Sequence, residues 1–274
     1  MVPYKAIKAS NALINDSKST APRIAVFVGA TSGIGQLTAS ALVATGTRVR
    51  IYLIGRKSSK ERAQNFIQEL HSISLKAEVI WTEGEASILG DVKRVCDIIK
   101  SKEKHVDLLF LTAGYVPFVP RDETAEGVEV TLSLRYYSRM MFILQLLPLL
   151  RQAKAARVIS VLGGGLLERP SIDLDDLDLK KPGSFGAMQS QVLSATMNTA
   201  ALERLAADSP SITFIHSCPG SVDTGNVRRG FEPDSLKACV QLGESISGTR
   251  RGGDDGGEEA EDGSKHGDYE NAYQ

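Results

Sequence analysis

The sequence is poor in cysteine, with three such residues in 274. Cys96, Cys218 and Cys239 stand far apart, and neither a Cys-x-x-Cys pair nor a Cys/His cluster occurs. An odd number of widely spaced cysteines argues against a disulfide framework and against a structural zinc site. We therefore expect no metal centre and a reducing compartment, with Cys96 part of an apolar helical face in the core.

Long apolar runs and an excess of charge of one sign are also lacking. The nearest candidate for a membrane span, Met140–Leu150, is short and is flanked by Arg139 and Arg151. The first 22 residues lack the apolar centre of a signal peptide. A formal net charge of −1 gives no global reason to expect nucleic-acid binding. We expect a cytoplasmic protein that acts on a small molecule, without membrane or nucleic-acid partners.

Apolar, β-branched runs alternate with amphipathic segments through most of the chain. The runs predicted as strands are Ile24–Val28, Val49–Ile54, Ala77–Trp81, Val106–Leu111, Arg157–Leu162 and Ile212–His216. The segments predicted as helices are Gly33–Thr45, Ser59–Ser72, Ser87–Ser101, Val128–Leu150 and Ser184–Ala207, with a further short helix at Asp234–Leu242. This alternation predicts an α/β fold with a doubly wound parallel sheet of about six strands.

The two ends of the chain differ from this pattern. Residues 1–22 are predicted to be an N-terminal extension and residues 23–242 the α/β domain. Residues 243–274 are rich in Gly, Ser, Asp and Glu. Such a segment cannot bury enough apolar surface to offset its ordering entropy, so a disordered tail is expected. An acidic tail that binds a partner is the alternative.

A glycine loop lies directly between the first predicted strand and the first predicted helix. It runs Gly29-Ala30-Thr31-Ser32-Gly33-Ile34-Gly35, with the spacing Gly-x-x-x-Gly-x-Gly. Glycines at this position allow a tight turn and close approach to a pyrophosphate, which the free N–H groups of the helix N-terminus bind. The loop is not a Walker A motif, since Gln36 stands where that motif needs Lys. The alternative is a plain strand-to-helix turn.

The second predicted strand is followed by Arg56 and Lys57, and no acidic residue lies at its end. In a Rossmann unit this position reaches the adenosine ribose, where an acid favours NAD and Arg can hold a 2′-phosphate. The two cations therefore favour NADP(H). The alternative is that both are solvated surface charges.

With the loop at Gly29–Gly35, the chain resembles the short-chain dehydrogenases/reductases over roughly Arg23 to Arg229. Thr112-Ala113-Gly114 resembles the family's Asn-Ala-Gly, and Pro219-Gly220-Ser221-Val222-Asp223-Thr224 resembles its Pro-Gly-x-x-x-Thr, which closes over the nicotinamide. Glu85 stands where the family usually has an Asp that contacts adenine. Segments such as Tyr136–Arg139 also resemble divergent fungal members, many of which serve secondary metabolism.

The residues that perform the family's chemistry are missing. The resemblance implies a Tyr general acid with a Lys four residues later, but these positions fall near Gly186 and Ser190. The family's Ser falls near Gly163, and its helix Asn aligns with Arg135. The cofactor-binding part of the signature is therefore kept, whereas the usual proton donor is lost.

Three residues are candidates for a replacement catalytic group: Arg135, Tyr137 and Ser160. Arg135 could stabilise an oxyanion or clamp a phosphate. Tyr137, with its neighbour Tyr136, could equally be a packed aromatic residue, and Ser160 a small core residue. We interpret His216 as a buried histidine whose ring nitrogens are hydrogen-bonded within the protein. A group of acidic residues follows the fifth predicted strand: Glu168, Asp173, Asp175, Asp176 and Asp178. We interpret them as solvated surface charges; the alternative is that some of them approach a substrate.

The resemblance also implies a C-terminal helix and strand for which the sequence after Thr224 leaves little room. Homo-oligomerisation through the family's C-terminal surfaces is therefore in question. The leading interpretation is an NADP(H)-dependent oxidoreductase acting on a carbonyl or alcohol of a small lipophilic metabolite. The alternatives are a non-redox enzyme (isomerase, dehydratase or cyclase) and a non-catalytic nucleotide-binding protein on the same scaffold.

Overall fold

The computed structural model describes residues 3–12, 22–114, 120–220, 222 and 224. This part of the chain contains a six-stranded sheet in the order β3-β2-β1-β4-β5-β6, in which all adjacent strands are parallel. The strands are β1 (Ile24–Val28), β2 (Val49–Gly55), β3 (Ala77–Glu83), β4 (Leu108–Leu111), β5 (Arg157–Val161) and β6 (Thr213–Ser217). This is the strand order of a doubly wound Rossmann-type sheet, so the predicted fold class is confirmed.

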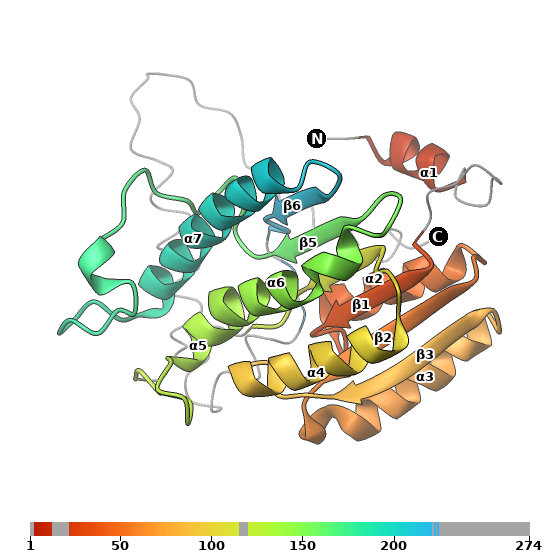
Figure 1. Ribbon diagram of the computed structural model, residues 1–274, viewed down its shortest axis with the longest axis horizontal. Helices are drawn as coiled ribbons and strands as arrows, with labels where there is room; N and C mark the ends of the chain where they lie inside the picture. Colours follow the sequence, from red (N-terminus) through yellow and green to blue (C-terminus); the bar gives the residue numbers. More distant parts are fainter. Residues whose placement is uncertain (1–2, 13–21, 115–119, 221, 223, 225–274) are drawn as a thin grey trace, which may run out of the picture. The chain divides into compact units, whose positions relative to one another are not determined.

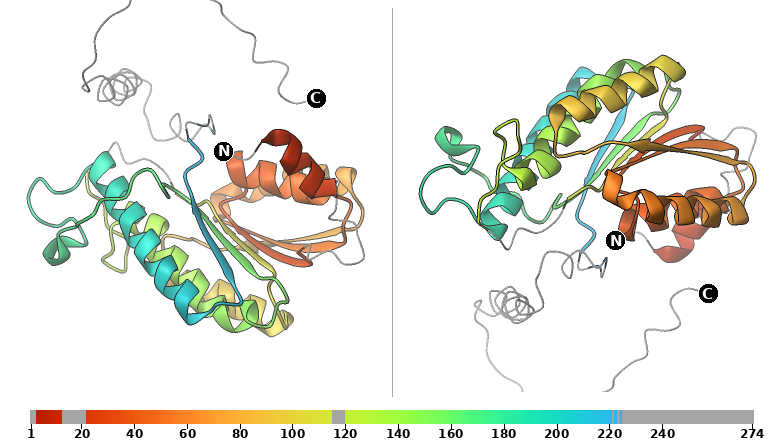
Figure 2. Two further views of the ribbon diagram at one scale, coloured as in Figure 1. Left: turned by 90° about the horizontal axis from the view of Figure 1, so that it is seen from above. Right: turned by 90° about the horizontal axis from the view of Figure 1, so that it is seen from below.

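Helices connect the strands and lie on both faces of the sheet (Figures 1 and 2). The main ones are α2 (Gly33–Ala44), α3 (Lys60–Ile73), α4 (Leu89–Lys102), α6 (Ser138–Leu150) and α7 (Ala187–Asp208). Shorter elements are the helix α5 (Val130–Leu132) and the 3₁₀ turns η2 (Lys57–Ser59) and η4 (Leu174–Asp176). An N-terminal helix α1 (Tyr4–Ala12) lies in the segment predicted as an N-terminal extension.

The two faces of β1 show how the sheet is covered. Ala25 and Phe27 belong to an apolar cluster with residues of α2 and α3, whereas Val26 and Val28 belong to a second cluster with residues of α4 and α6. Alternate residues of a strand point to opposite faces, and here both faces are buried. The continuous apolar runs of the sequence are therefore explained by a central strand with helices on each side.

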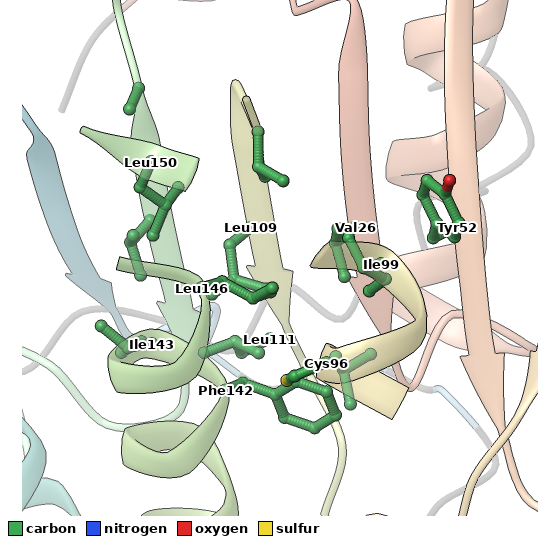
Figure 3. Close-up of a cluster of buried hydrophobic side chains, with 14 of the residues drawn as sticks. Val26, Tyr52, Cys96, Ile99, Leu109, Leu111, Phe142, Ile143, Leu146 and Leu150 are labelled. Carbon is green, nitrogen blue, oxygen red and sulfur yellow. The ribbon is translucent and has the colours of Figure 1, made fainter. Parts of the chain in front are cut away.

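The larger cluster lies under α4 and α6, and Figure 3 shows its packing. Leu109 and Leu111 of β4 contact it from the sheet, and Phe142, Ile143 and Leu146 from α6. Cys96 is fully buried in the same cluster, as the sequence predicted. The apolar run Met140–Leu150 thus packs against the sheet as one side of the core.

The predicted helix Val128–Leu150 is helical from Val130 to Leu150, but it is not α-helical throughout. The carboxylate of Glu129 accepts hydrogen bonds from the N–H groups of Thr131 and Leu132 at 2.9 and 2.7 Å, so the helix begins at Val130. A π-helical turn, η3 (Ser133–Tyr137), then separates α5 from α6. Hydrophobic periodicity does not reveal such a turn, because one wider turn changes the spacing by a single residue.

Other boundaries shift by one to three residues. The fourth strand begins at Leu108 and not at Val106, whose N–H bonds the Leu149 carbonyl at the end of α6. The last described helix begins at Ala187 and not at Ser184, whose N–H and hydroxyl both bond the Lys181 carbonyl in a turn. The predicted helix Asp234–Leu242 and the predicted tail lie outside the described residues. Within the described segments, every helix falls short of the length and apolarity that a bilayer crossing requires.

We predict that Leu146→Ala lowers the free energy of unfolding by about 2–5 kcal/mol, because Leu146 is fully buried and its loss leaves a cavity. Leu144→Ala on the same helix should change it by about 0.5 kcal/mol or less, since Leu144 is 54% exposed. Urea unfolding followed by circular dichroism measures both. Equal effects would contradict the packing of α6.

Candidate functional site: a glycine cradle at the carboxyl edge of the sheet

The glycine loop occupies the point where the strand order reverses, between β1 and β4. It runs from the end of β1 to Gly33, the first residue of α2, and Ser32 is the extended N-cap residue. Gly29 and Gly33 have φ values of +90° and +61°, which residues with a side chain rarely adopt. The backbone therefore needs glycine at both positions.

Close packing behind the loop imposes a second requirement. A Cβ atom on Gly29 would lie 2.5 Å from the Ala113 nitrogen, and one on Gly35 would lie 2.8 Å from the Thr112 Oγ1. Thr112 also donates its hydroxyl to the carbonyls of Val28 and Gly29, at 3.2 Å each. The glycine loop thus packs directly against the turn Thr112–Gly114 after β4.

The segment after β6 reaches the same loop. A Cβ on Gly33 would lie 2.7 Å from the Cβ of Thr224, so these two residues are in close contact. Pro219, Gly220 and Val222 precede Thr224 and are exposed. Residues that are far apart in the sequence, 29–35, 112–114 and 224, therefore meet at one edge of the sheet. We call this arrangement the glycine cradle.

The end of β2 lies beside the cradle. Gly55 contacts both Trp81 of β3 and Thr31 of the loop, since a Cβ there would lie 2.8 Å from the Trp81 ring and 3.2 Å from the Thr31 methyl. Arg56 and Lys57 follow directly and are exposed. No ion pair joins either side chain to another of the described residues. Both cations are therefore open to an incoming anion.

Glu85 has a partner inside the protein. Its Oε1 accepts hydrogen bonds from the N–H and the hydroxyl of Ser87, at 3.2 and 3.0 Å, and its own N–H donates to Asp91 at 2.6 Å. The carboxylate thus shapes the loop between β3 and α4, and it is half-buried there.

The cradle fits a dinucleotide pyrophosphate. The two positive-φ glycines and the close approach at Gly35 keep the loop free of side-chain bulk, and the first turn of α2 carries no acidic residue. Ser32 makes no side-chain cap hydrogen bond, so its hydroxyl does not occupy the N–H groups of that turn. A helix N-terminus of this kind attracts an anion through its N–H groups and its dipole.

The positions of the family's Tyr and Lys lie at the start of α7. Gly186 is the N-cap residue of this helix, and its φ of 179° is ordinary extended backbone. Ser190 is buried and accepts a hydrogen bond from Arg135 Nη1 at 3.2 Å. Arg135, itself 2% exposed, comes from the π-helical turn. A guanidinium from the neighbouring helix therefore reaches the place on α7 where the resemblance puts a lysine.

Ser160 lies near the end of β5 and is fully buried. It accepts a hydrogen bond from Arg139 Nη1 at 2.7 Å and donates to Asn198 Oδ1 at 3.1 Å. Burial, with repulsion from Arg135, lowers the pKa of Arg139 to about 9, so this guanidinium is still charged at neutral pH. The structure places Ser160 in a polar network between β5, α6 and α7.

Tyr137 donates its hydroxyl to Asp178 Oδ1 at 2.7 Å. Burial, together with this bond to a carboxylate, raises the pKa of Tyr137. The shift is in the opposite direction from the one that a phenolic general acid requires. Tyr136 packs edge-on against Tyr137, with ring centroids 5.2 Å apart.

The remaining loop acids mostly hold their own loop. Asp173 pairs with Lys181 at 2.6 Å, and Asp176 accepts from the N–H groups of Lys180 and Lys181. Glu168 differs, because its Oε1 accepts from Gly165 N–H at 2.6 Å and from the Thr199 hydroxyl at 2.7 Å. Within the described residues, no three His, Cys, Asp or Glu side chains gather as a metal site would require.

His216 lies next to this group. Its Nδ1 is 2.7 Å from the Thr199 hydroxyl, and its Nε2 accepts from the Gly163 N–H at 3.4 Å. Burial first, and then the positive charge of Arg139, lower the pKa of His216 to about 4. The histidine is thus neutral at pH 7 and fixes the loop that begins at Gly163, the position of the family's Ser.

Sequence reasoning missed Arg139, Asn198 and Thr199 as members of these networks. The one signal in the sequence was the charge of Arg139 directly before the apolar run of α6. The sequence interpretation treated this residue only as the end of that run. Asn198 and Thr199 lie inside a long helix of mixed polarity, and nothing local distinguishes them from surface residues.

The strand order, the switch-point loop and the contact from the segment after β6 define a Rossmann-type domain. The family model described as short chain dehydrogenase matches residues 23–165. The chain therefore belongs to the short-chain dehydrogenase family, and the resemblance expected from the sequence is confirmed.

Three known proteins illustrate this similarity. An NmrA-like family domain-containing oxidoreductase, notO, of Aspergillus sp. (strain MF297-2) is 36% identical over 248 residues, which are 89% of this chain and 74% of that protein. Oxidoreductase AN1596 of Emericella nidulans is 39% identical over 232 residues, 84% of this chain and 67% of that protein. The RhlG/NADP active-site complex of Pseudomonas aeruginosa shares the fold with a TM-score of 0.55 at 22% identity, covering 80% of each chain.

We predict that Gly29→Ala lowers the free energy of unfolding by about 2 kcal/mol or more, because both the positive φ and the contact with Ala113 oppose a Cβ. Gly46→Ala is the matched control: its φ is +71°, but its Cβ would meet nothing within 4 Å, so about 1 kcal/mol is expected. Chemical unfolding measures both. A Gly29→Ala protein as stable as Gly46→Ala would argue against the close packing.

A second prediction concerns acid stability. Because the pKa of His216 falls from 6.5 in the unfolded chain to about 4 in the fold, the unfolded state binds more protons between these values. Stability should therefore fall as pH decreases from 6.5 to 4, by about 3 kcal/mol from this residue alone. His216→Gln should flatten the dependence in this window when unfolding is measured at several pH values. An unchanged slope would show that His216 is not held neutral.

Proposed function

We propose that this protein is an NADP(H)-dependent oxidoreductase that transfers a hydride between the nicotinamide and a carbonyl or alcohol of a small lipophilic metabolite. The observation that carries the proposal is the glycine cradle, assembled at the switch point from Gly29–Gly35, Thr112–Gly114 and Thr224. It stands in a chain whose fungal relatives are named oxidoreductases.

The preference for NADP(H) rests on Arg56 and Lys57. Both follow β2 at the point where Gly55 contacts Thr31 of the loop, and both are exposed. A guanidinium matches a phosphate in geometry and charge, whereas neither residue gives a 2′-hydroxyl the acceptor that it needs. The RhlG/NADP complex of Pseudomonas aeruginosa, which shares the fold, is consistent with this choice.

A lipophilic substrate is favoured by exposed apolar side chains on the segments that follow β5 and β6. Leu166 and Leu174 on the segment after β5, Met188 at the start of α7 and Val222 after β6 are exposed, at 59%, 74%, 41% and 44%. Exposed apolar side chains on segments that follow the carboxyl ends of strands lower the cost of seating an apolar molecule there.

For the catalytic step we favour Arg135 over Tyr137 and Ser160. The nicotinamide, when bound, supplies or accepts the hydride. Arg135 brings a permanent positive charge to Ser190 on α7, where it can stabilise negative charge on a substrate oxygen. Tyr137 is the second candidate, but its hydroxyl is engaged with Asp178. Ser160 is enclosed in the network with Arg139 and Asn198, so it orders the strand end more directly than it meets a substrate.

One observation favours a second candidate function. Neither Gly186 nor Ser190 can donate a proton as the family's Tyr and Lys do, and the shifted pKa of Tyr137 does not replace them. A non-redox enzyme (isomerase, dehydratase or cyclase), or a protein that binds nucleotide without turnover, would keep the cradle and lose these groups. Binding and turnover measurements separate the two cases.

We predict that the protein binds NADPH more tightly than NADH, and that Arg56→Ala weakens NADPH binding by about tenfold with little effect on NADH. The fluorescence of Trp81 reports the titration, since it is the single tryptophan and its ring lies against Gly55, next to Arg56. Arg204→Ala is the control, because Arg204 pairs with Asp208 at the far end of α7.

Equal weakening of both nucleotides, or none, would overturn the role of Arg56. Absence of binding in folded protein would overturn the proposed function. Binding of NADPH without consumption across a panel of lipophilic ketones and aldehydes would favour the second candidate function.

A further inference from the structure

Arg139 is a buried arginine whose hydrogen-bond acceptors are all neutral. The residue is 2% exposed. Its guanidinium donates to the carbonyls of Leu134, Val161 and Ala113 at 3.3, 2.9 and 2.9 Å, and to the Ser160 hydroxyl at 2.7 Å. No carboxylate of the described residues lies within ion-pair distance of it.

Such an arrangement costs stability. A buried charge loses its hydration, and neutral acceptors compensate for this loss only in part. Arg135, four residues earlier and also buried, adds repulsion between like charges. An apolar side chain of similar volume would pack between α6 and the sheet without these costs. The arginine must therefore contribute something other than stability.

Its two terminal nitrogens reach different strands. The paired register of β4 and β5 ends at Leu111 and Ser160. Arg139 Nη2 binds the carbonyl of Ala113, two residues past the end of β4, and Nη1 binds the carbonyl of Val161, the last residue of β5. The planar fork of the guanidinium thus extends the connection between the two strand ends.

One of these ends belongs to the glycine cradle. Ala113 is the residue against which Gly29 packs, with a distance of 2.5 Å from a Cβ on Gly29 to the Ala113 nitrogen. The other end leads into Leu162 and Gly163, where the loop held by His216 begins. A shift of either carbonyl would move the back of the cradle relative to that loop.

We propose that Arg139 is a positioning residue that locks the turn behind the glycine loop to the carboxyl end of β5, and that dinucleotide affinity depends on this lock. The affinity part of the inference rests on the proposed function, whereas the lock itself does not. The residue acts through Ala113 and Val161 and does not itself touch substrate or cofactor.

The test uses the full-length chain and four variants. Arg139→Met removes the charge and the fork and keeps the volume, whereas Arg139→Lys keeps the charge without the fork. Arg151→Met alters an arginine at the other end of α6, which binds Ser209. Leu146→Ala weakens the core of the same helix without breaking a polar contact, so it controls for general destabilisation.

Two readouts are combined. Amide hydrogen exchange of the nucleotide-free protein reports the N–H groups of Ala113 and Leu162, which bond the carbonyls of Val28 and Ser217. Titration with NADPH gives the dissociation constant. We expect Arg139→Met and Arg139→Lys to exchange about tenfold faster at both amides and to bind NADPH about tenfold more weakly, whereas Arg151→Met and Leu146→Ala leave the affinity within about twofold.

Each outcome decides part of the inference. Unchanged exchange at Ala113 and Leu162 in Arg139→Met overturns the lock. Faster exchange with unchanged NADPH affinity overturns the link to nucleotide binding. An equal loss of affinity in Leu146→Ala shows that general destabilisation is the cause. Should the wild-type chain bind neither dinucleotide, the proposed function fails, and the exchange result alone decides whether the lock exists.

Discussion

The contact between Gly29 and Ala113 is the constraint on which the rest of the site depends. It brings the loop after β1 and the turn after β4 closer together than any side chain on Gly29 would permit. The same approach places the N-terminus of α2 at the switch point of the sheet, where its N–H groups would bind a pyrophosphate. Thr112 from behind and Thr224 from the segment after β6 then complete the cradle. The apolar clusters on both faces of the sheet hold these loops in place.

Beneath the neighbouring strand ends, the protein has a polar layer that differs from the family's usual set of catalytic groups. Arg135 and Arg139 enter from the helix that follows β4, and they meet Ser190 on α7 and Ser160 on β5. His216, Thr199 and Glu168 form a second, neutral-to-acidic network under the loop at Gly163. Positive charge that the family places on α7 therefore comes here from the preceding helix. The role proposed for Arg135 at a substrate oxygen rests on this exchange.

The sequence predicted most of the fold and the place of the glycine loop in it. Apolar runs located all six described strands, and the glycine spacing located the loop, because both depend on local sequence and on a backbone that only glycine can adopt. The π-helical turn at Ser133–Tyr137 was missed, since a turn of this kind leaves no mark on periodicity. The partners of Arg139 and of Tyr137 were also missed, because Ala113, Val161 and Asp178 are distant in sequence and contribute a carbonyl or one carboxylate among many. The roles of Arg56, Glu85 and Arg135 toward a ligand stay predictions.

The central claim is that a dinucleotide binds in the glycine cradle at the carboxyl edge of the sheet. Its most direct test is a titration of the ¹⁵N-labelled protein with NADPH, followed residue by residue in amide NMR spectra. We expect the largest shifts at Gly29–Gly35 and Thr112–Gly114, with smaller ones at Arg56. Shifts confined to the opposite edge, where Arg23, Arg48 and Lys76 form a basic surface at the amino ends of β1 to β3, would contradict the account.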